Sequence, residues 1–150
     1  MTGRNPTDRG KSGVKRHVIA DEAGIPIGVG ITAANVNEVT VAELVVDSVV
    51  VAVPRGIRRP ENLCLDKGYD SAALDRQLRS RGITPHTRRR GEDPLLGVVR
   101  GKPRRWVVER TNSWHNRFRG LLIRWETKPQ NYLAMFCLAS GLIAFQQALR

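Results

Sequence analysis

A carboxylate directly follows a predicted strand near the middle of this chain. Residues 62–65 have the character of a short strand and run into Asp66, and Gly68 then interrupts the run. The pair Asp70-Ser71 offers an N-cap for a helix predicted over residues 72–78. Because ligands gather at the carboxyl ends of strands in open α/β sheets, Asp66 is a candidate metal-binding catalytic carboxylate.

Glu109 is the second acidic candidate. It lies in the first turns of a long helix predicted from about Pro103 to about Glu126, nearly opposite the apolar stripe of that helix. An exposed glutamate near a helix N-terminus is also favourable for the helix dipole alone. Spacing by itself therefore leaves both Glu109 and Asp66 open between a catalytic role and a structural one.

The long helix must position Glu109, and its apolar residues recur at intervals of three and four, which predicts one buried face. These residues are Val107, Thr111, Trp114, Phe118, Leu121, Leu122 and Trp125. Both tryptophans are expected to lie in the core rather than to stack on bases. Pro129 is expected to end the helix, and a last apolar helix is predicted over residues 131–149.

Strands and helices alternate in the remaining chain, which predicts a mixed α/β fold. Turn residues at 21–24 join two β-prone runs into an antiparallel hairpin, and Gly82 ends the helix that follows Asp66. Apart from a loop at 1–13, the predicted elements are strands at 14–19 and 24–31, a helix at 39–53, a loop at 54–60, an edge strand at 83–87 and a basic loop at 88–101.

The charge of the chain indicates a polyanionic partner. Among its 150 residues, 25 Lys and Arg outnumber 14 Asp and Glu, for a formal net charge of +11. Such an excess is typical of nucleic-acid binding, although a GC-rich genome also enriches arginine. The hydrophobic fraction of 41% fits one globular domain rather than a disordered chain.

Cysteine usage and hydropathy predict a cytoplasmic protein. Cys64 and Cys137 lie far apart within apolar runs, without the spacing of a zinc site, and are expected to be buried thiols. The N-terminus has no apolar segment of the signal-peptide type. The most apolar stretch, residues 132–145, is shorter than the ~20 residues that a membrane span needs, and is expected to form a buried helix.

Several ordered motifs resemble one protein family. They are Leu65-Asp66-Lys67-Gly68-Tyr69-Asp70, Ile83-Thr84-Pro85 before an arginine-rich loop, Trp106-Val107-Val108-Glu109-Arg110-Thr111-Asn112-Ser113-Trp114, Phe118-Arg119-Gly120-Leu121, the stretch Pro6 to His17, and Ala33, Asn35, Asn37 and Glu38. Together they resemble bacterial insertion-sequence transposases of the DDE type, and the resemblance covers essentially the whole chain.

The resemblance implies an RNase H-like fold, a mixed sheet with flanking helices. In this family three carboxylates bind two Mg²⁺ ions that carry out DNA cleavage and strand transfer. Asp66 matches the second carboxylate and Glu109 the third. Mg²⁺ prefers hard oxygen ligands, which explains the need for acidic residues.

A basic signature surrounds the third carboxylate in the family and contacts phosphates near the cleaved end. The residues that match it here are Arg105, Arg110, Asn116 and Arg117. The alternative is a solvated helix face, but the net charge favours contact with DNA.

The chain departs from the family at its first catalytic aspartate, which belongs to a strand before the motif that starts at Pro6. Asp8 and Asp21 do not replace it, because one lies in a loop motif and the other in the hairpin turn. The missing strand would lie centrally, between the hairpin and the strand of Asp66. Residues 14–150 are therefore expected to form a partial DDE catalytic domain, the C-terminal portion of a transposase.

Alone, such a chain is expected to bind DNA weakly and to catalyse little. The alternative is a non-catalytic DNA-binding or inhibitory fragment that acts with full-length transposase. The protein partners considered are a second copy of the chain, in a homo-oligomer, or full-length transposase. An RNA-binding protein is less favoured, because no RNA-binding module with exposed stacking aromatic residues is evident.

Overall fold

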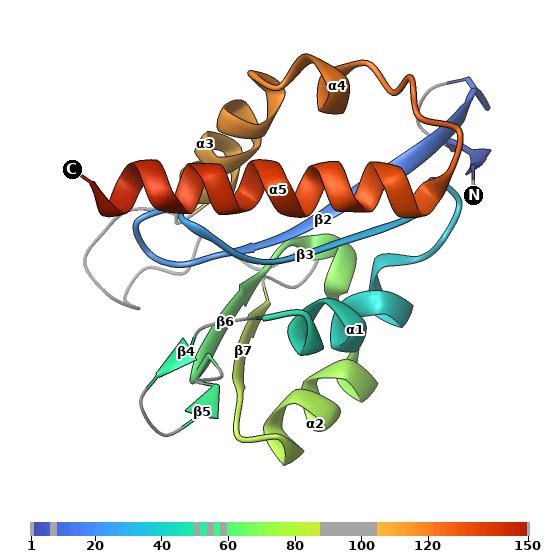
Figure 1. The fold of residues 1–150 in the computed structure, drawn as a ribbon. Coiled ribbons are helices and arrows are strands. Elements are labelled where there is room, and N and C mark those ends of the chain that lie inside the picture. Colours follow the sequence, from blue (N-terminus) through green and yellow to red (C-terminus); the bar gives the residue numbers. More distant parts are fainter. Residues whose placement is uncertain are drawn as a thin grey trace.

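The computed structural model describes residues 2–6, 9–49, 52–53, 56–57, 60–87 and 105–149, with only the backbone described at 52–53, 56–57 and 105. Its two main sheets are an antiparallel hairpin, β2 (Ser12–Ala20) with β3 (Pro26–Ala33), and a parallel pair, β6 (Asn62–Leu65) with β7 (Thr84–Thr87). Figure 1 shows helices around both sheets. The expected mixed α/β class is confirmed.

The hairpin turn forms where turn chemistry predicted it. The Asp21 carboxylate Oδ1 accepts a hydrogen bond from the Ile25 N–H at 2.8 Å, and the Gly24 N–H donates to the Asp21 carbonyl at 3.0 Å. Gly24 has φ 82°, a left-handed conformation that glycine adopts without steric cost. In the stretch expected to be a loop, β1 (Gly3–Arg4) pairs with the start of β2.

The helix predicted over residues 39–53 is much shorter in the structure. A 3₁₀ turn, η1 (Glu38–Val41), leads into α1 (Ala42–Asp47), and the short strands β4 (Ala52–Val53) and β5 (Gly56–Ile57) pair antiparallel after it. The prediction beyond Asp47 was wrong because the many valines of this stretch are β-branched, which favours extended backbone.

The elements around Asp66 match the sequence prediction closely. Helix α2 (Ala72–Ser80) begins after Ser71, whose hydroxyl accepts from the Leu74 N–H at 3.4 Å, and Gly82 follows its end with φ 75°. Leu74 and Leu78 are fully buried under the β6–β7 pair, in one core cluster with Leu63 and Ile83.

The long helix predicted from Pro103 to Glu126 is broken within the described residues. It consists of α3 (Arg105–Asn116) and α4 (Arg119–Leu122), with extended backbone at Phe118 (φ −83°, ψ 102°) between them. The break lets Phe118 and Leu121 turn onto the last helix, where they join a second core cluster.

That last helix, α5 (Pro129–Ala148), starts at Pro129, which the sequence analysis placed beyond a helix end rather than at a helix start. Proline is well tolerated in the first turn because its missing N–H has no intrahelical partner there. The expectation that Trp125 lies in the core was wrong, since it is 73% exposed, whereas Trp114 is half-buried.

Helix α5 is buried on one side only, which corrects the prediction of a buried helix over residues 132–145. Tyr132, Phe136 and Ile143 are buried, and the first two pack with valines of the hairpin, while Leu138 and Phe145 are exposed. The prediction of buried thiols was also wrong, because Cys64 and Cys137 are both exposed free cysteines. None of the described helices is both long and apolar enough to cross a membrane.

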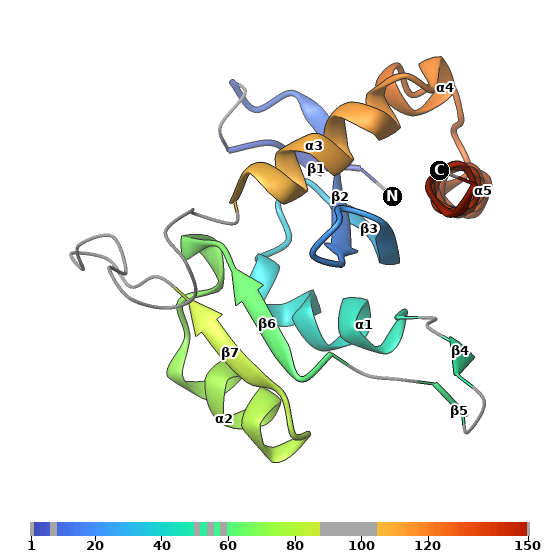
Figure 2. The same ribbon diagram turned by 90° about the vertical axis from the view of Figure 1, so that its left-hand side faces the viewer.

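The hairpin is the central layer of the molecule. Figures 1 and 2 show α5 and α3 on one side of it and, on the other, α1 with the β6–β7 pair beside it and α2 farther away. Side chains of β2 alternate between the two layers: Val14 and Val18 pack into the cluster of α5, and Ile19 packs into the cluster of α1 and α2.

Candidate active site

Asp66 occupies the position that the sequence predicted, directly after the last residue of β6. Its exposed carboxylate caps η2 (Lys67–Tyr69), because Oδ1 accepts the Lys67 N–H at 2.7 Å. The Tyr69 N–H in turn donates to the Asp66 carbonyl at 2.9 Å. Backbone hydrogen bonds thus fix the orientation of an exposed acid at the carboxyl end of a parallel strand.

A second acidic side chain reaches this turn from η1. Glu38 pairs with Lys15 of β2, with 2.7 Å between Lys15 Nζ and Glu38 Oε1, and Nζ also donates to the Val36 carbonyl at 2.9 Å. A Cβ atom added to Gly68 would come within 4.0 Å of the Glu38 carboxyl carbon. The Lys15–Glu38 pair therefore connects the hairpin to the turn that holds Asp66.

The pKa values of Tyr69 and Glu38 are shifted by burial and by the charges around the Lys15–Glu38 pair. Burial raises the pKa of the Tyr69 phenol, and the carboxylates of Glu38 and Asp66 raise it further. Burial acts to raise the pKa of Glu38, but hydrogen bonds from Lys15 and the backbone outweigh it, so that this pKa is lowered. The site therefore holds Glu38 as a carboxylate at neutral pH.

Glu109 lies on α3, exposed, as the sequence predicted. The next residue, Arg110, fixes the helix on the hairpin turn. Its guanidinium donates to the Ala23 carbonyl and lies 4.4 Å from the centre of the Trp106 ring and 5.2 Å from that of Trp114. These contacts within the protein hold α3 against the hairpin turn.

Thr111 completes the contact between α3 and the hairpin turn. Its fully buried hydroxyl lies 2.7 Å from the Gly24 carbonyl and 3.0 Å from the Val107 carbonyl of its own helix. A Cβ atom on Gly24 would meet Arg110 Nη2 at 2.9 Å and Thr111 Oγ1 at 3.3 Å, so a side chain there would displace the Arg110 guanidinium and press on Thr111. The backbone that carries Glu109 is thus anchored at residues 110 and 111.

On the opposite side, α3 is joined to α5 through His115. This fully buried imidazole lies 2.9 Å from the Thr111 carbonyl through Nδ1 and 2.9 Å from Ser140 Oγ through Nε2, edge-on to the Phe136 ring. Burial lowers the pKa of His115, the Thr111 carbonyl opposes this, and the charge of Arg16 lowers it further. The sequence analysis did not single out His115, although it lies four residues from Thr111 on the predicted helix.

Comparison with known proteins gives the family of this chain. The family model described as "Transposase DDE domain" matches residues 2–142. The chain belongs to the DDE transposase family. It is also 40% identical over 156 residues, covering 99% of this chain and 71% of the relative, to a protein of Burkholderia cepacia named "Putative transposase for insertion sequence element IS402". No solved structure matches the chain.

The residues of this transposase domain that were expected to contact DNA fall into different surroundings. Arg117 is exposed at the end of α3, and Asn116 Oδ1 accepts from Arg16 Nη2 at 2.7 Å. Arg110 is half-buried and holds the helix in place. The side chain of Arg105 lies outside the described part of the chain, as does the whole basic loop at 88–101.

The chemistry of Asp66 and Glu109 suits Mg²⁺, but the described residues do not complete a site. Carboxylate oxygens are the hard donors that Mg²⁺ prefers. Among the residues that the structure describes, no three His, Cys, Asp or Glu side chains gather in an arrangement that could hold a metal ion. Lys15 and Glu38, which flank the Asp66 turn, are the residues of this region whose contacts the sequence analysis missed.

Proposed function

We propose that this transposase chain supplies Asp66 and Glu109 as two of three carboxylates that bind Mg²⁺ for DNA cleavage and strand transfer. The observation that carries the proposal is the exposed Asp66 carboxylate, fixed by the Lys67 N–H at the carboxyl end of β6. When bound, two such ions would activate the attacking oxygen and stabilise the leaving one. The protein's own contribution is to hold the two carboxylates on rigid backbone.

The third carboxylate would come from a strand that completes the sheet. In the described part of the chain, β6 has β7 as its partner, and β2 pairs along its length with β3 and briefly with β1. Unpaired strand edges favour the addition of another strand, because their N–H and C=O groups need partners. A strand inserted between β2 and β6 would give the RNase H-like sheet and bring its carboxylate near Asp66.

The net charge supports DNA as the substrate. A formal charge of +11 attracts a polyanion and releases counterions when Lys and Arg neutralise phosphates. Exposed Arg117, directly after the end of α3, is a candidate phosphate contact, and so is Arg105. Such contacts position DNA without reading its sequence.

A cleavage assay tests the proposal with DNA that carries the terminal repeats of the encoding element. With Mg²⁺, the chain alone should cleave little, and co-expression with an upstream segment carrying an acidic strand should restore cleavage. Asp66→Asn or Glu109→Gln should abolish the restored activity, while the exposed control Glu22→Gln should retain it. Efficient cleavage by the chain alone would disprove the proposal that its site lacks a carboxylate. Activity that survives Asp66→Asn would disprove the proposed metal-binding role of Asp66.

A non-catalytic role is the second candidate, and the high net charge favours it equally. A fragment that binds DNA or joins full-length transposase would inhibit transposition without using its carboxylates. In that case Asp66→Ala should leave both DNA binding and inhibition intact. Loss of inhibition in this variant would favour the catalytic role instead.

A further inference from the structure

The outer side of α5 carries a continuous apolar face. Its large exposed members are Leu138 (66% exposed), Leu142 (42%), Phe145 (62%) and Leu149 (71%). They follow one another at intervals of four, three and four residues, the spacing by which one helix presents a seam to another. Cys137 and Gly141, both exposed, lie beside them.

This face is free of charge, unlike the rest of the chain. Helix α5 has 20 residues and contains no Asp, Glu, Lys or Arg, whereas 26% of the whole sequence is charged. Two copies of a protein with net charge +11 repel one another through most surfaces. Face-to-face contact of two α5 helices places no like charges together, and an acidic partner would find no cation on this helix.

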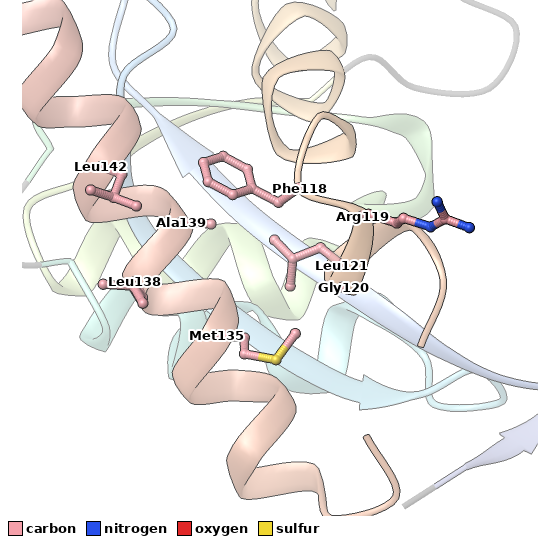
Figure 3. A pocket seen from close by; sticks show the side chains of 8 residues that line it. All are labelled: Phe118, Arg119, Gly120, Leu121, Met135, Leu138, Ala139 and Leu142. Carbon is pink, nitrogen blue, oxygen red and sulfur yellow. The ribbon is translucent and has the colours of Figure 1, made fainter. Parts of the chain in front are cut away.

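An apolar pocket of about 220 Å³ opens beside the same face, between α4 and α5. Figure 3 shows Phe118 and Leu121 on one side and Met135, Leu138, Ala139 and Leu142 of α5 on the other, with the charged end of Arg119 directed away. A cavity of ~150 Å³ lined by apolar groups is known to hold a benzene ring. The pocket can therefore hold an aromatic side chain, and the face itself exposes one, Phe145.

We propose that two copies of this chain associate through the outer face of α5, packed antiparallel about a twofold axis at Leu142, with Phe145 of each copy in the pocket of the other. The α5 residues that line the pocket run from Met135 to Leu142, so along the helix their middle lies at residues 138–139, and the midpoint between these positions and Phe145 falls at Leu142. In this register Leu149 of one copy faces Met135 of the second copy. One register therefore matches the pocket, the aromatic side chain and the remaining apolar residues, as a self-complementary interface requires.

Sedimentation equilibrium of the purified chain tests the association directly. The wild-type chain should form a dimer that dissociates on dilution. Leu142→Glu places two carboxylates together at the axis and should weaken the dimer at least about tenfold. Leu44→Glu is the matched control, since Leu44 is a 67% exposed leucine on α1, and it should leave the dimer unchanged.

Cross-linking tests the register. In a Cys64→Ser, Cys137→Ser background, Leu142→Cys should form a disulfide-linked dimer under mild oxidation, because residue 142 of each copy lies at the axis. Gln130→Cys, exposed in the first turn of α5, should not. Far-UV circular dichroism checks that each variant folds, and Phe145→Glu should repeat the effect of Leu142→Glu.

Three results would overturn the proposal. A chain that stays monomeric at all accessible concentrations excludes the interface. A dimer that Leu142→Glu and Phe145→Glu leave intact uses another surface. A dimer in which Leu142→Cys does not cross-link has another register.

Discussion

The guanidinium of Arg110 lies 4.4 Å from the centre of the Trp106 ring, one turn earlier on α3. The same group reaches the Ala23 carbonyl of the hairpin turn and lies near Trp114. An arginine that follows the candidate carboxylate Glu109 is thus enclosed by two aromatic rings of its own helix. We infer that Arg110 acts on Glu109 by fixing the position of α3.

Replacement of Arg110 by lysine should destabilise the fold. A lysine ammonium cannot stack its plane on indole rings or present the same fork of donors, so we expect a loss of ~1–2 kcal/mol in the free energy of unfolding. Urea denaturation followed by tryptophan fluorescence measures it. Arg117→Lys, at an exposed position directly after α3, is the control and should change stability by less than ~0.5 kcal/mol. Equal stability of both variants would show that the stacking contributes nothing.

DNA-binding measurements should distinguish the roles of Arg110 and Arg117. If Arg117 contacts a phosphate, Arg117→Ala should weaken binding to any duplex and reduce the slope of log K against log salt by ~1. Arg110→Ala, measured where it is fully folded, should keep the wild-type slope, because the Arg110 side chain binds the hairpin turn and not a phosphate. Fluorescence anisotropy across a salt series gives both slopes. The assignment fails if the slope falls in the Arg110 variant alone.

The close approach of α3 to the hairpin turn makes Gly24 sensitive to substitution. Gly24→Ala must adopt φ 82° and place a methyl group 2.9 Å from Arg110 Nη2, so we expect destabilisation of ~2–3 kcal/mol. Gly82→Ala is a matched control with φ 75° and nothing within 4 Å of the added atom, and should lose only ~1–2 kcal/mol. Thermal and urea unfolding compare them. A loss in Gly24→Ala no larger than in Gly82→Ala would refute the steric contact.

Stability should fall as the pH is lowered from neutral. Burial lowers the pKa of His17, with Glu38 opposing and Lys15 assisting, and burial likewise lowers that of His115. Below the ordinary histidine pKa of ~6.5 the unfolded chain therefore binds more protons than the folded one, and the free energy of unfolding decreases. The contribution is fully present above that pKa and is lost as the pH falls toward the lowered folded values.

Urea unfolding at pH 7.5, 6.5 and 5.5 measures this dependence. His115→Gln should reduce the slope of stability against pH, whatever its effect at pH 7.5. His86→Gln leaves both buried histidines in place and should retain the wild-type slope. A stability that is constant between pH 7.5 and 5.5 would contradict the prediction.

The Lys15–Glu38 pair should stabilise the Asp66 turn locally. Glu38→Gln removes the charge that joins β2 to η1 beside Gly68 of η2, so the Lys67 and Tyr69 amides should exchange hydrogen faster while amides in the middle of α5 remain protected. The exchanged pair Lys15→Glu with Glu38→Lys should recover part of the protection. Asp47→Asn, which removes an ion pair between α1 and Arg81 at the end of α2, serves as the control. Uniformly faster exchange would indicate a general loss of stability instead.

The local order of elements could be predicted from the sequence alone. The hairpin, the strand before Asp66, the cap at Ser71 and the glycine at 82 depend on residues close together in the chain, so propensities and turn chemistry suffice for them. The ordered motifs around Asp66 and Glu109 likewise indicated the family that the comparisons show.

Contacts between distant segments were decided only by the tertiary structure. The helix breaks at Phe118 because burying Phe118 and Leu121 against α5 is more favourable than continuing α3. Helical periodicity in the sequence contains no information about that packing. The role of Arg110 depends on a carbonyl 87 residues earlier in the chain, and the pairing of Lys15 with Glu38 on the approach of two sheets. A sequence pattern states which faces are apolar or charged, but which face meets which is set by how the layers pack.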